Sequence, residues 1–159
     1  MTDPELELGK LLTTRRLTIA TAESCTGGLI ANLITNVPGS SSYFEGGVIT
    51  YSNASKIEFL SVPNKTLRKF GAVSEETAAA MAIGIRKLTE ADLGLAVTGI
   101  AGPTGGTKQK PVGLVYIALA DVKKVEKFQF KFNGSRLEIK NQTANAALKI
   151  LLDYIKKKS

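Results

Sequence analysis

The 159-residue sequence contains no histidine and a single cysteine, Cys25. One chain of this sequence therefore has no Ser-His-Asp triad and no histidine-ligated metal site. One thiol is also too few for a thiolate zinc cluster. Hydrolytic chemistry is thereby restricted to serine or threonine with lysine or tyrosine, to paired carboxylates, or to a metal held by oxygen ligands alone.

The sequence also lacks any apolar run that approaches the roughly 18 residues of a membrane span. Its first residues include Asp3, Glu5 and Glu7, and they have neither the basic start nor the apolar core of a signal peptide. A secreted domain would more often carry paired cysteines. We therefore expect a cytoplasmic protein.

Aromatic residues are scarce, at 6%, and no aromatic-rich strand is present on which nucleic-acid bases would stack. The net charge is +7, but residues 156–158 form a lysine tail and Lys123, Lys124 and Lys127 gather around a predicted hairpin turn. This distribution suits an anionic small molecule as well as a nucleic acid. We expect a small-molecule substrate, with neither nucleic acid nor membrane as the main partner, and a homo-oligomer stays open.

The remaining composition is that of an ordinary globular protein, with 43% hydrophobic and 22% charged residues. No repeat or linker is visible, so residues 1–159 are predicted to form a single domain. Predicted strands cover residues 17–22, 46–51, 93–98, 113–120 and 125–132, and predicted helices cover residues 3–16, 29–35, 53–61, 66–70, 74–88 and a last helix from Arg136. This order predicts an α/β fold, namely a three-layer α/β/α sandwich with a mixed, mostly parallel sheet of about five strands.

The stretch from Gly39 to Lys56 combines a serine cluster, a short predicted strand and a lysine. A serine activated by a lysine base is a known alternative to the histidine-based triad. The competing interpretation is that Ser40, Ser41 and Ser42 form a polar turn and that Lys56 is a solvated helix residue. From these residues alone, both interpretations remain.

Two further turns follow predicted buried strands. Residues 23–28 lead from a strand into a helix, where free backbone N–H groups can hold an anion. Alternatively, Ser24 or Thr26 is an ordinary N-cap and Cys25 a small buried residue. The glycine-rich loop over residues 99–107 matches neither a Walker A motif nor the dinucleotide fingerprint. It occupies the place where open α/β sheets bind ligands, and a mobile connector is the alternative.

Six motifs, taken in order, resemble the CinA C-terminal domain family. They are Ala22-Glu23-Ser24-Cys25-Thr26-Gly27-Gly28, Gly39-Ser40-Ser41, Val48-Ile49-Thr50-Tyr51-Ser52-Asn53 with Lys56, Gly71-Ala72-Val73-Ser74, Thr98-Gly99-Ile100-Ala101-Gly102-Pro103 with Gly105-Gly106, and Lys110-Pro111-Val112-Gly113. The resemblance runs from about Leu6 to the last helix. The family often carries an N-terminal domain of a different type, so we expect a stand-alone form.

Members of this family include nicotinamide mononucleotide deamidases. The resemblance implies metal-independent hydrolysis of nicotinamide mononucleotide to nicotinic acid mononucleotide and ammonia, without a cofactor. It implies that Ser41 is the nucleophile, that Lys56 is its base and that Tyr51 supplies a hydroxyl to the same network. It also implies that Ser24, Thr98 and Arg136 orient or bind the substrate. One departure is Gly134-Ser135-Arg136, where family members often have Gly-Asp-Arg.

Elementary chemistry adds conditions to this assignment. A lysine with a pKa of about 10.4 accepts a proton at neutral pH only when burial or nearby cations lower that value, so Lys56 has to be partly buried. Backbone N–H groups near Ser24 or in the serine loop would stabilise an oxyanion, and Arg136 or the glycine-rich loop would bind a phosphate. The expected substrate-binding residues are Ser24, Thr26, Gly27, Thr98, Gly99, Gly102, Gly105 and Arg136.

Two alternatives to a Ser/Lys amidohydrolase stay open. One is a catalytically silent ligand-binding or interaction module related to competence proteins. The other is a hydrolase whose metal is held by oxygen ligands from Glu23, Glu45 or Asp92.

Overall fold

The computed structural model describes residues 3–158, which form a five-stranded sheet in the order β2-β1-β3-β4-β5. The strands are β1 (Ile19–Glu23), β2 (Phe44–Ile49), β3 (Leu93–Gly99), β4 (Leu114–Ala120) and β5 (Val125–Lys131). β1 is parallel to both β2 and β3, whereas β4 is antiparallel to β3 and to β5. Only β4 therefore runs against the other strands, and the predicted mixed sheet of about five strands is confirmed.

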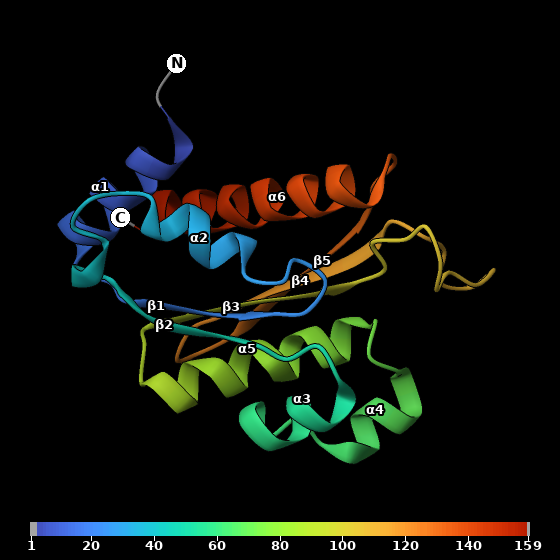
Figure 1. Ribbon diagram of the computed structural model, residues 1–159. Coiled ribbons are helices and arrows are strands. Elements are labelled where there is room, and N and C mark those ends of the chain that lie inside the picture. Colours follow the sequence, from blue (N-terminus) through green and yellow to red (C-terminus); the bar gives the residue numbers. More distant parts are fainter. Residues whose placement is uncertain (1–2, 159) are drawn as a thin grey trace.

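Helices cover both faces of the sheet, as predicted for a three-layer sandwich (Figure 1). One layer consists of α1 (Pro4–Arg15), α2 (Leu29–Thr35) and α6 (Arg136–Lys157), and the other of α3 (Asn53–Leu60), α4 (Asn64–Phe70) and α5 (Glu75–Thr89). Two clusters of buried apolar side chains, one on each face, fill the space between helices and sheet. No helix among residues 3–158 is long and apolar enough to span a membrane.

Local sequence signals account for where the helices begin. Ser74 caps α5 by accepting a hydrogen bond from the backbone N–H of Thr77. Ser135 and Glu138 form a reciprocal capping box at the start of α6. Since serine and aspartate are both strong N-cap residues, the departure at Ser135 leaves the cap intact. Arg136 is consequently held at the first position of the longest helix.

The alanine-rich helix α5 packs closely on the sheet. A Cβ added to Gly94 of β3 would collide with the backbone carbonyl oxygen of Ala82 and with Cβ of Arg86, both in α5. Glycine at this position therefore lets helix and strand approach more closely than any side chain would allow. The many small alanine side chains of α5 allow the same close approach along the helix.

The register of the parallel strands decides which loops meet. Glu23, the last residue of β1, pairs with Ile49 at the end of β2 and with Val97 near the end of β3. The residues that follow these strands therefore share one edge of the sheet, as in other open α/β sheets. Segments that precede the strands lie at the opposite edge.

Candidate functional site

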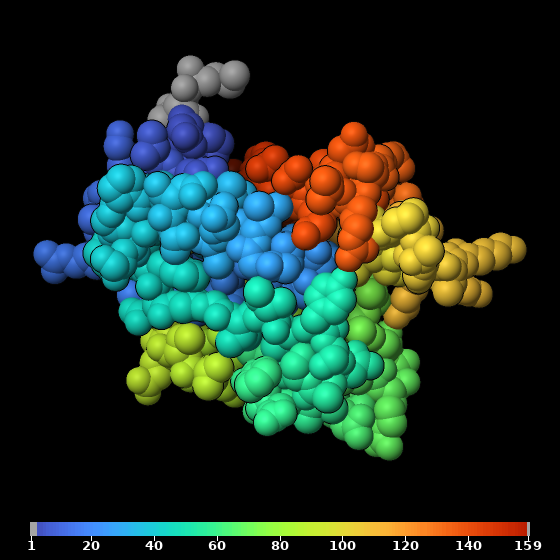
Figure 2. All heavy atoms as spheres, viewed as in Figure 1, coloured from blue at the N-terminus to red at the C-terminus, as the bar shows by residue number. Residues whose placement is uncertain are grey.

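A cavity of 180 Å³ lies at the edge where β1, β2 and β3 end. Its lining residues come from four loops, two helices and the end of β3, and they are Ser24, Cys25, Tyr51, Lys56, Ala72, Val73, Thr98, Gly99, Ala101 and Arg136. In the space-filling view, the segment after β2 (teal), the loop after β3 (yellow) and the start of α6 (orange) meet on one face (Figure 2). Segments far apart in sequence thus enclose one small polar site.

Lys56 is the most unusual residue of this cavity. Lysine is almost never fully buried in proteins, yet Lys56 is only 1% exposed. Its Nζ donates hydrogen bonds to Ser24 Oγ at 3.2 Å and to the Thr50 carbonyl at 2.7 Å. A weaker contact of 3.4 Å reaches the Tyr51 carbonyl. In the part of the chain that the structure describes, no carboxylate pairs with this ammonium.

The position of Lys56 lowers its pKa. Burial disfavours the ammonium form and is the larger influence, and a Coulombic interaction with Cys25 acts weakly in the opposite direction. Ser52 fixes the helix that carries the lysine, because its side chain caps α3 by accepting from the Ser55 N–H at 3.1 Å. The site therefore holds an amine that loses its proton more readily than a solvated lysine.

Ser24 is the hydroxyl that this amine contacts. It is buried directly after β1, and its N–H extends the sheet by donating to the Val97 carbonyl at 3.2 Å. A serine Oγ in contact with a buried lysine of lowered pKa has the geometry of a nucleophile and its base. Sequence reasoning placed Ser24 among the binding residues and missed this contact. The sequence feature that could have indicated this contact is the position of Ser24 at the end of a predicted strand, because the residues that follow the next predicted strand, near residue 50, lie at the same edge of the sheet.

The predicted pairing of Ser41 with Lys56 is wrong within one chain. Ser41 is exposed in the 3₁₀ helix η1 (Ser40–Ser42), which precedes β2, whereas Lys56 follows that strand. A strand of six residues separates its two ends by about 20 Å at 3.3 Å per residue. The serine cluster is a polar turn, in which Ser42 Oγ donates to the Gly39 carbonyl at 3.0 Å.

Glu23 rather than Ser24 or Thr26 caps the helix after β1. The buried Glu23 carboxylate accepts from the N–H groups of Ile30, at 2.9 Å, and Ala31, at 3.0 Å, in the first turn of α2. Thr26 Oγ1 donates to the same carboxylate at 2.5 Å, so this hydroxyl supports the cap and does not face the cavity. The N-cap interpretation of Ser24 and Thr26 is therefore wrong.

Cys25 lines the cavity but is not an activated thiol. Burial is the main cause of a pKa raised to about 12 for Cys25; a backbone hydrogen bond acts to lower this pKa, and the nearby Glu23 carboxylate acts to raise it. The thiol therefore stays protonated at neutral pH. The interpretation of Cys25 as a small buried residue agrees with this environment.

Arg136 closes the opposite side of the cavity together with Tyr51. Its Nη2 donates to Tyr51 Oη at 2.9 Å and its Nη1 to the Gly102 carbonyl at 2.7 Å. The Tyr51 hydroxyl thus bonds to Arg136, and it is the Tyr51 carbonyl that faces Lys56 Nζ. The Tyr51 side chain is 61% exposed, so the pair forms the rim of the site.

The remaining predicted binding residues divide into two groups. Thr98 and Gly99 line the cavity, and Thr98 Oγ1 donates to the Ala72 carbonyl at 2.8 Å. Gly27 and Gly105 are exposed and lie outside the lining. Gly105 belongs to the loop after β3, which projects away from the body of the molecule (Figure 1).

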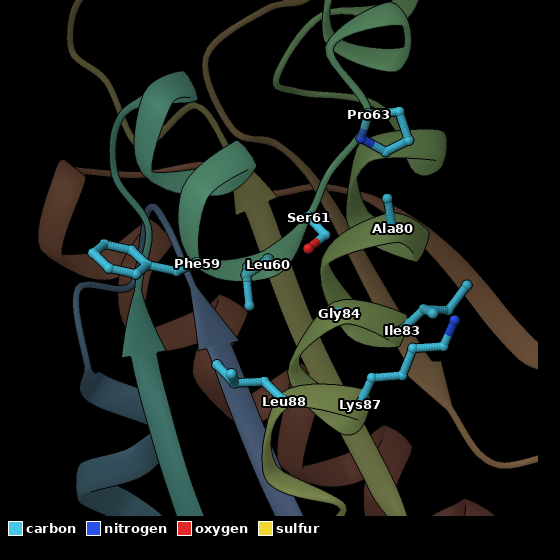
Figure 3. Close-up of a pocket in the computed structure, with 9 residues that line it drawn as sticks. All are labelled: Phe59, Leu60, Ser61, Pro63, Ala80, Ile83, Gly84, Lys87 and Leu88. Atoms are coloured by element: carbon cyan, nitrogen blue, oxygen red, sulfur yellow. The ribbon is translucent and has the colours of Figure 1, made fainter.

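A larger hollow of 440 Å³ lies elsewhere, between α3 and α5 (Figure 3). Its lining is mostly apolar and includes Phe59, Ile83 and Leu88, with Lys87 as its one titratable side chain. This lining contains no hydroxyl paired with a base. The smaller cavity around Lys56 is therefore the candidate site.

The carboxylates considered as metal ligands are dispersed. Glu23 caps α2, and Asp92, which precedes β3, accepts from both the N–H and the hydroxyl of Thr18. Glu45 is an exposed residue of the edge strand β2. Residues 3–158 contain no group of three or more Cys, Asp or Glu side chains arranged to hold a metal ion.

Comparisons with known proteins agree with the sequence resemblance. Residues 2–155 match the family model of the CinA C-terminal domain. A CinA-like protein of Endomicrobium trichonymphae is 56% identical over 143 residues, which cover 90% of this chain and 33% of that protein. A putative competence-damage inducible protein of Halothermothrix orenii is 56% identical over 151 residues, covering 94% of this chain and 37% of that protein. The chain thus spans about a third of the length of these curated relatives.

Solved structures extend the similarity along nearly the whole chain. The competence/damage inducible protein CihA from Agrobacterium tumefaciens has a TM-score of 0.89 and 40% identity, with 96% of each chain covered. A competence-damaged protein (CinA) superfamily protein from Klebsiella pneumoniae has a TM-score of 0.94 and 30% identity, covering 97% of this chain and 96% of that one.

Proposed function

Because this chain belongs to the CinA C-terminal domain family, we propose that it is an amidohydrolase that converts nicotinamide mononucleotide to nicotinic acid mononucleotide and ammonia. The observation that supports a hydrolytic role is the contact of 3.2 Å between the buried Lys56 Nζ and Ser24 Oγ at the cavity. The proposed nucleophile is therefore Ser24, in place of Ser41, and the proposed base is Lys56.

In the proposed reaction, Ser24 Oγ attacks the carboxamide carbon while neutral Lys56 Nζ takes the hydroxyl proton. The tetrahedral intermediate carries a negative oxygen, for which the backbone N–H groups of the turn after Ser24 are the proposed donors. Lys56 returns the proton to the amide nitrogen, and the C–N bond breaks to release ammonia. An ester between the nicotinoyl carbonyl and Ser24 remains.

Water completes the cycle. Lys56, again neutral, removes a proton from water, whose oxygen attacks the ester carbonyl. The C–O bond to Ser24 breaks, the lysine returns its proton to the serine oxygen, and the carboxylic acid gives its own proton to solvent and leaves as its carboxylate. The burial that lowers the pKa of Lys56 serves both half-reactions, because each begins with the free amine.

The remaining cavity residues have binding roles in this proposal. Thr98 and Gly99 form the wall at the end of β3, and Tyr51 and Arg136 form the rim. The guanidinium of Arg136 supplies positive charge where an anionic nucleotide would enter. The proposed partner is therefore a pyridine mononucleotide.

An ammonia-release assay with nicotinamide mononucleotide tests the proposal, with Ser24→Ala, Lys56→Met and Ser41→Ala measured in parallel. We expect Ser24→Ala and Lys56→Met to lower kcat by at least about 1,000-fold, as for other nucleophile and base deletions. Ser41→Ala is the matched control, because it removes the same hydroxyl from an exposed turn outside the cavity.

Three results would change the assignment. Loss of activity in Ser41→Ala with retention in Ser24→Ala would return the nucleophile to the serine cluster. Binding of the nucleotide by the wild type without ammonia release would favour the ligand-binding module. Activity that disappears on exhaustive chelation and returns with a metal would favour a metal hydrolase.

A further inference from the structure

Lys140 lies four residues after Arg136 in α6, so both side chains project from the same face of the helix. Lys140 is half-buried, and its Nζ lies 3.7 Å from the position that a Cβ on Gly27 would occupy. Gly27 stands two residues beyond Cys25, which lines the site cavity. Lys140 therefore reaches from α6 to the turn that carries Ser24.

The ammonium of Lys140 has no ion-pair partner within residues 3–158, although other lysines of α6 do. Lys149 pairs with Asp153 at 2.9 Å and Lys156 with Glu7 at 2.6 Å. Glu138, the carboxylate two residues before Lys140 in α6, is engaged in the capping box. A partly desolvated ammonium without a counter-ion is costly, and an anionic ligand would offset that cost.

Arg136 is exposed, and it too lacks a carboxylate partner among the described residues. Its guanidinium donates hydrogen bonds to the Tyr51 hydroxyl and the Gly102 carbonyl, which are both uncharged acceptors. Among the described residues, no carboxylate neutralises the guanidinium. Two cations one helical turn apart, Arg136 in the cavity lining and Lys140 beside Gly27, thus have no carboxylate partner among the described residues.

The charge of Lys140 also acts on the cavity lining. Burial is the main influence on the pKa of Cys25 and raises it, whereas the ammonium groups of Lys140 and Lys56 both act to lower it. Lys140 and Lys56 thus act on Cys25 from two different elements, α6 and α3. A ligand whose reacting carboxamide lies near Ser24 and Lys56 could place an anionic group near Lys140 in α6.

We propose that Lys140 and Arg136 form a subsite for a phosphate monoester, and that Lys140 selects a phosphorylated nucleotide over the free nucleoside. The inference rests on the proposed function, since it assigns one end of the same substrate. Gly27 N–H donates to the Ser24 carbonyl, so these residues bound a turn whose ends lie within about 7 Å. A mononucleotide can bridge from Ser24 to an ammonium beside Gly27.

The test compares wild type, Lys140→Gln, Lys140→Arg and the control Lys149→Gln, which removes a lysine from the exposed part of the same helix. Calorimetric titration with ribose 5-phosphate, and with ribose as the uncharged control, measures the subsite without catalysis. Ammonia release from nicotinamide mononucleotide and from nicotinamide riboside then separates KM from kcat.

We expect Lys140→Gln to weaken ribose 5-phosphate binding by about ten-fold or more, the usual effect of losing a charge-assisted hydrogen bond. KM for the mononucleotide should rise by a similar factor, with kcat within about two-fold of wild type and the riboside kinetics unchanged. Lys140→Arg should retain most of the binding. Lys149→Gln should behave as wild type.

Equal ribose 5-phosphate binding by wild type and Lys140→Gln would overturn the inference. An equal rise of KM for nucleotide and nucleoside would do the same, because it would indicate a structural role. If the wild type releases ammonia from neither compound, the proposed function fails, and the ribose 5-phosphate titration alone decides the role of Lys140.

Discussion

Lys56 Nζ lies 3.2 Å from Ser24 Oγ, although the two residues are 32 positions apart in the chain. They meet because Ser24 follows β1 and Lys56 lies just after β2, and these parallel strands end at the same edge of the sheet. The contact joins a hydroxyl to an amine whose pKa is lowered by burial. Four predictions follow from this site and from the helices that support it.

The rate of amide hydrolysis should rise with pH through the lowered pKa of Lys56, because the neutral amine is the reactive form. The ascending limb of kcat/KM should therefore have its midpoint below the ordinary lysine value of about 10.4. A pH–rate profile of the wild type measures this midpoint. A limb centred at or above the ordinary value would show that burial does not activate the amine.

The stability of the wild type relative to Lys56→Met should increase as pH rises. The folded state holds Lys56 with a lowered pKa, so between the folded and unfolded pKa values the unfolded chain binds more protons. The free energy of unfolding contributed by Lys56 therefore grows with pH across this window and levels off above the unfolded value. Urea titrations of both proteins at several pH values measure the difference, and a constant difference contradicts the prediction.

Glu23→Ala should destabilise the protein by about 2–4 kcal/mol, because it removes a buried cap and leaves donors of α2 without an acceptor. Glu23→Gln keeps one carbonyl acceptor and should lose less. Denaturant unfolding measures both values. Equal stability of Glu23→Ala and wild type would show that the carboxylate does not hold the helix.

Ser135→Ala should cost about 1 kcal/mol by removing the side-chain half of the capping box of α6. Ser135→Asp should keep the stability of the wild type, since aspartate is an equally strong N-cap residue. Thermal unfolding compares the two substitutions. A loss in Ser135→Asp as large as that in Ser135→Ala would mean that Ser135 acts through something other than the cap.

Much of the fold follows from local patterns in the sequence. Short, mostly apolar runs predict β1 and β3, the alternation of charged and aromatic residues predicts the edge strand β5, and Ser74 marks the start of α5. Each of these patterns depends on residues that are close together in the sequence, so it can be read without the tertiary structure. The boundaries of β2 were less accurate, since the strand covers Phe44–Ile49 and the prediction covered residues 46–51.

Part of the candidate site could also be predicted from local sequence patterns, because these patterns locate the strand ends. Residues at strand ends, such as Ser24, Thr98 and Tyr51, were singled out and line one cavity. The pairing of Ser41 with Lys56, which the family resemblance implied, is not formed within one chain, because β2 separates the serine turn that precedes it from the lysine that follows it. Lys140 could not be predicted as a site residue, because no local sequence pattern distinguishes one lysine of a helix from another.

The sequence by itself determined the element order, the family and the kinds of chemistry that a chain without histidine can perform. Only the tertiary structure decided which hydroxyl the lysine contacts and which cation lies beside the turn after Ser24. The physical reason is that hydrogen bonding and desolvation act over a few ångströms in space. The register of β1 against β2 and β3, rather than the spacing of residues along the chain, sets those distances.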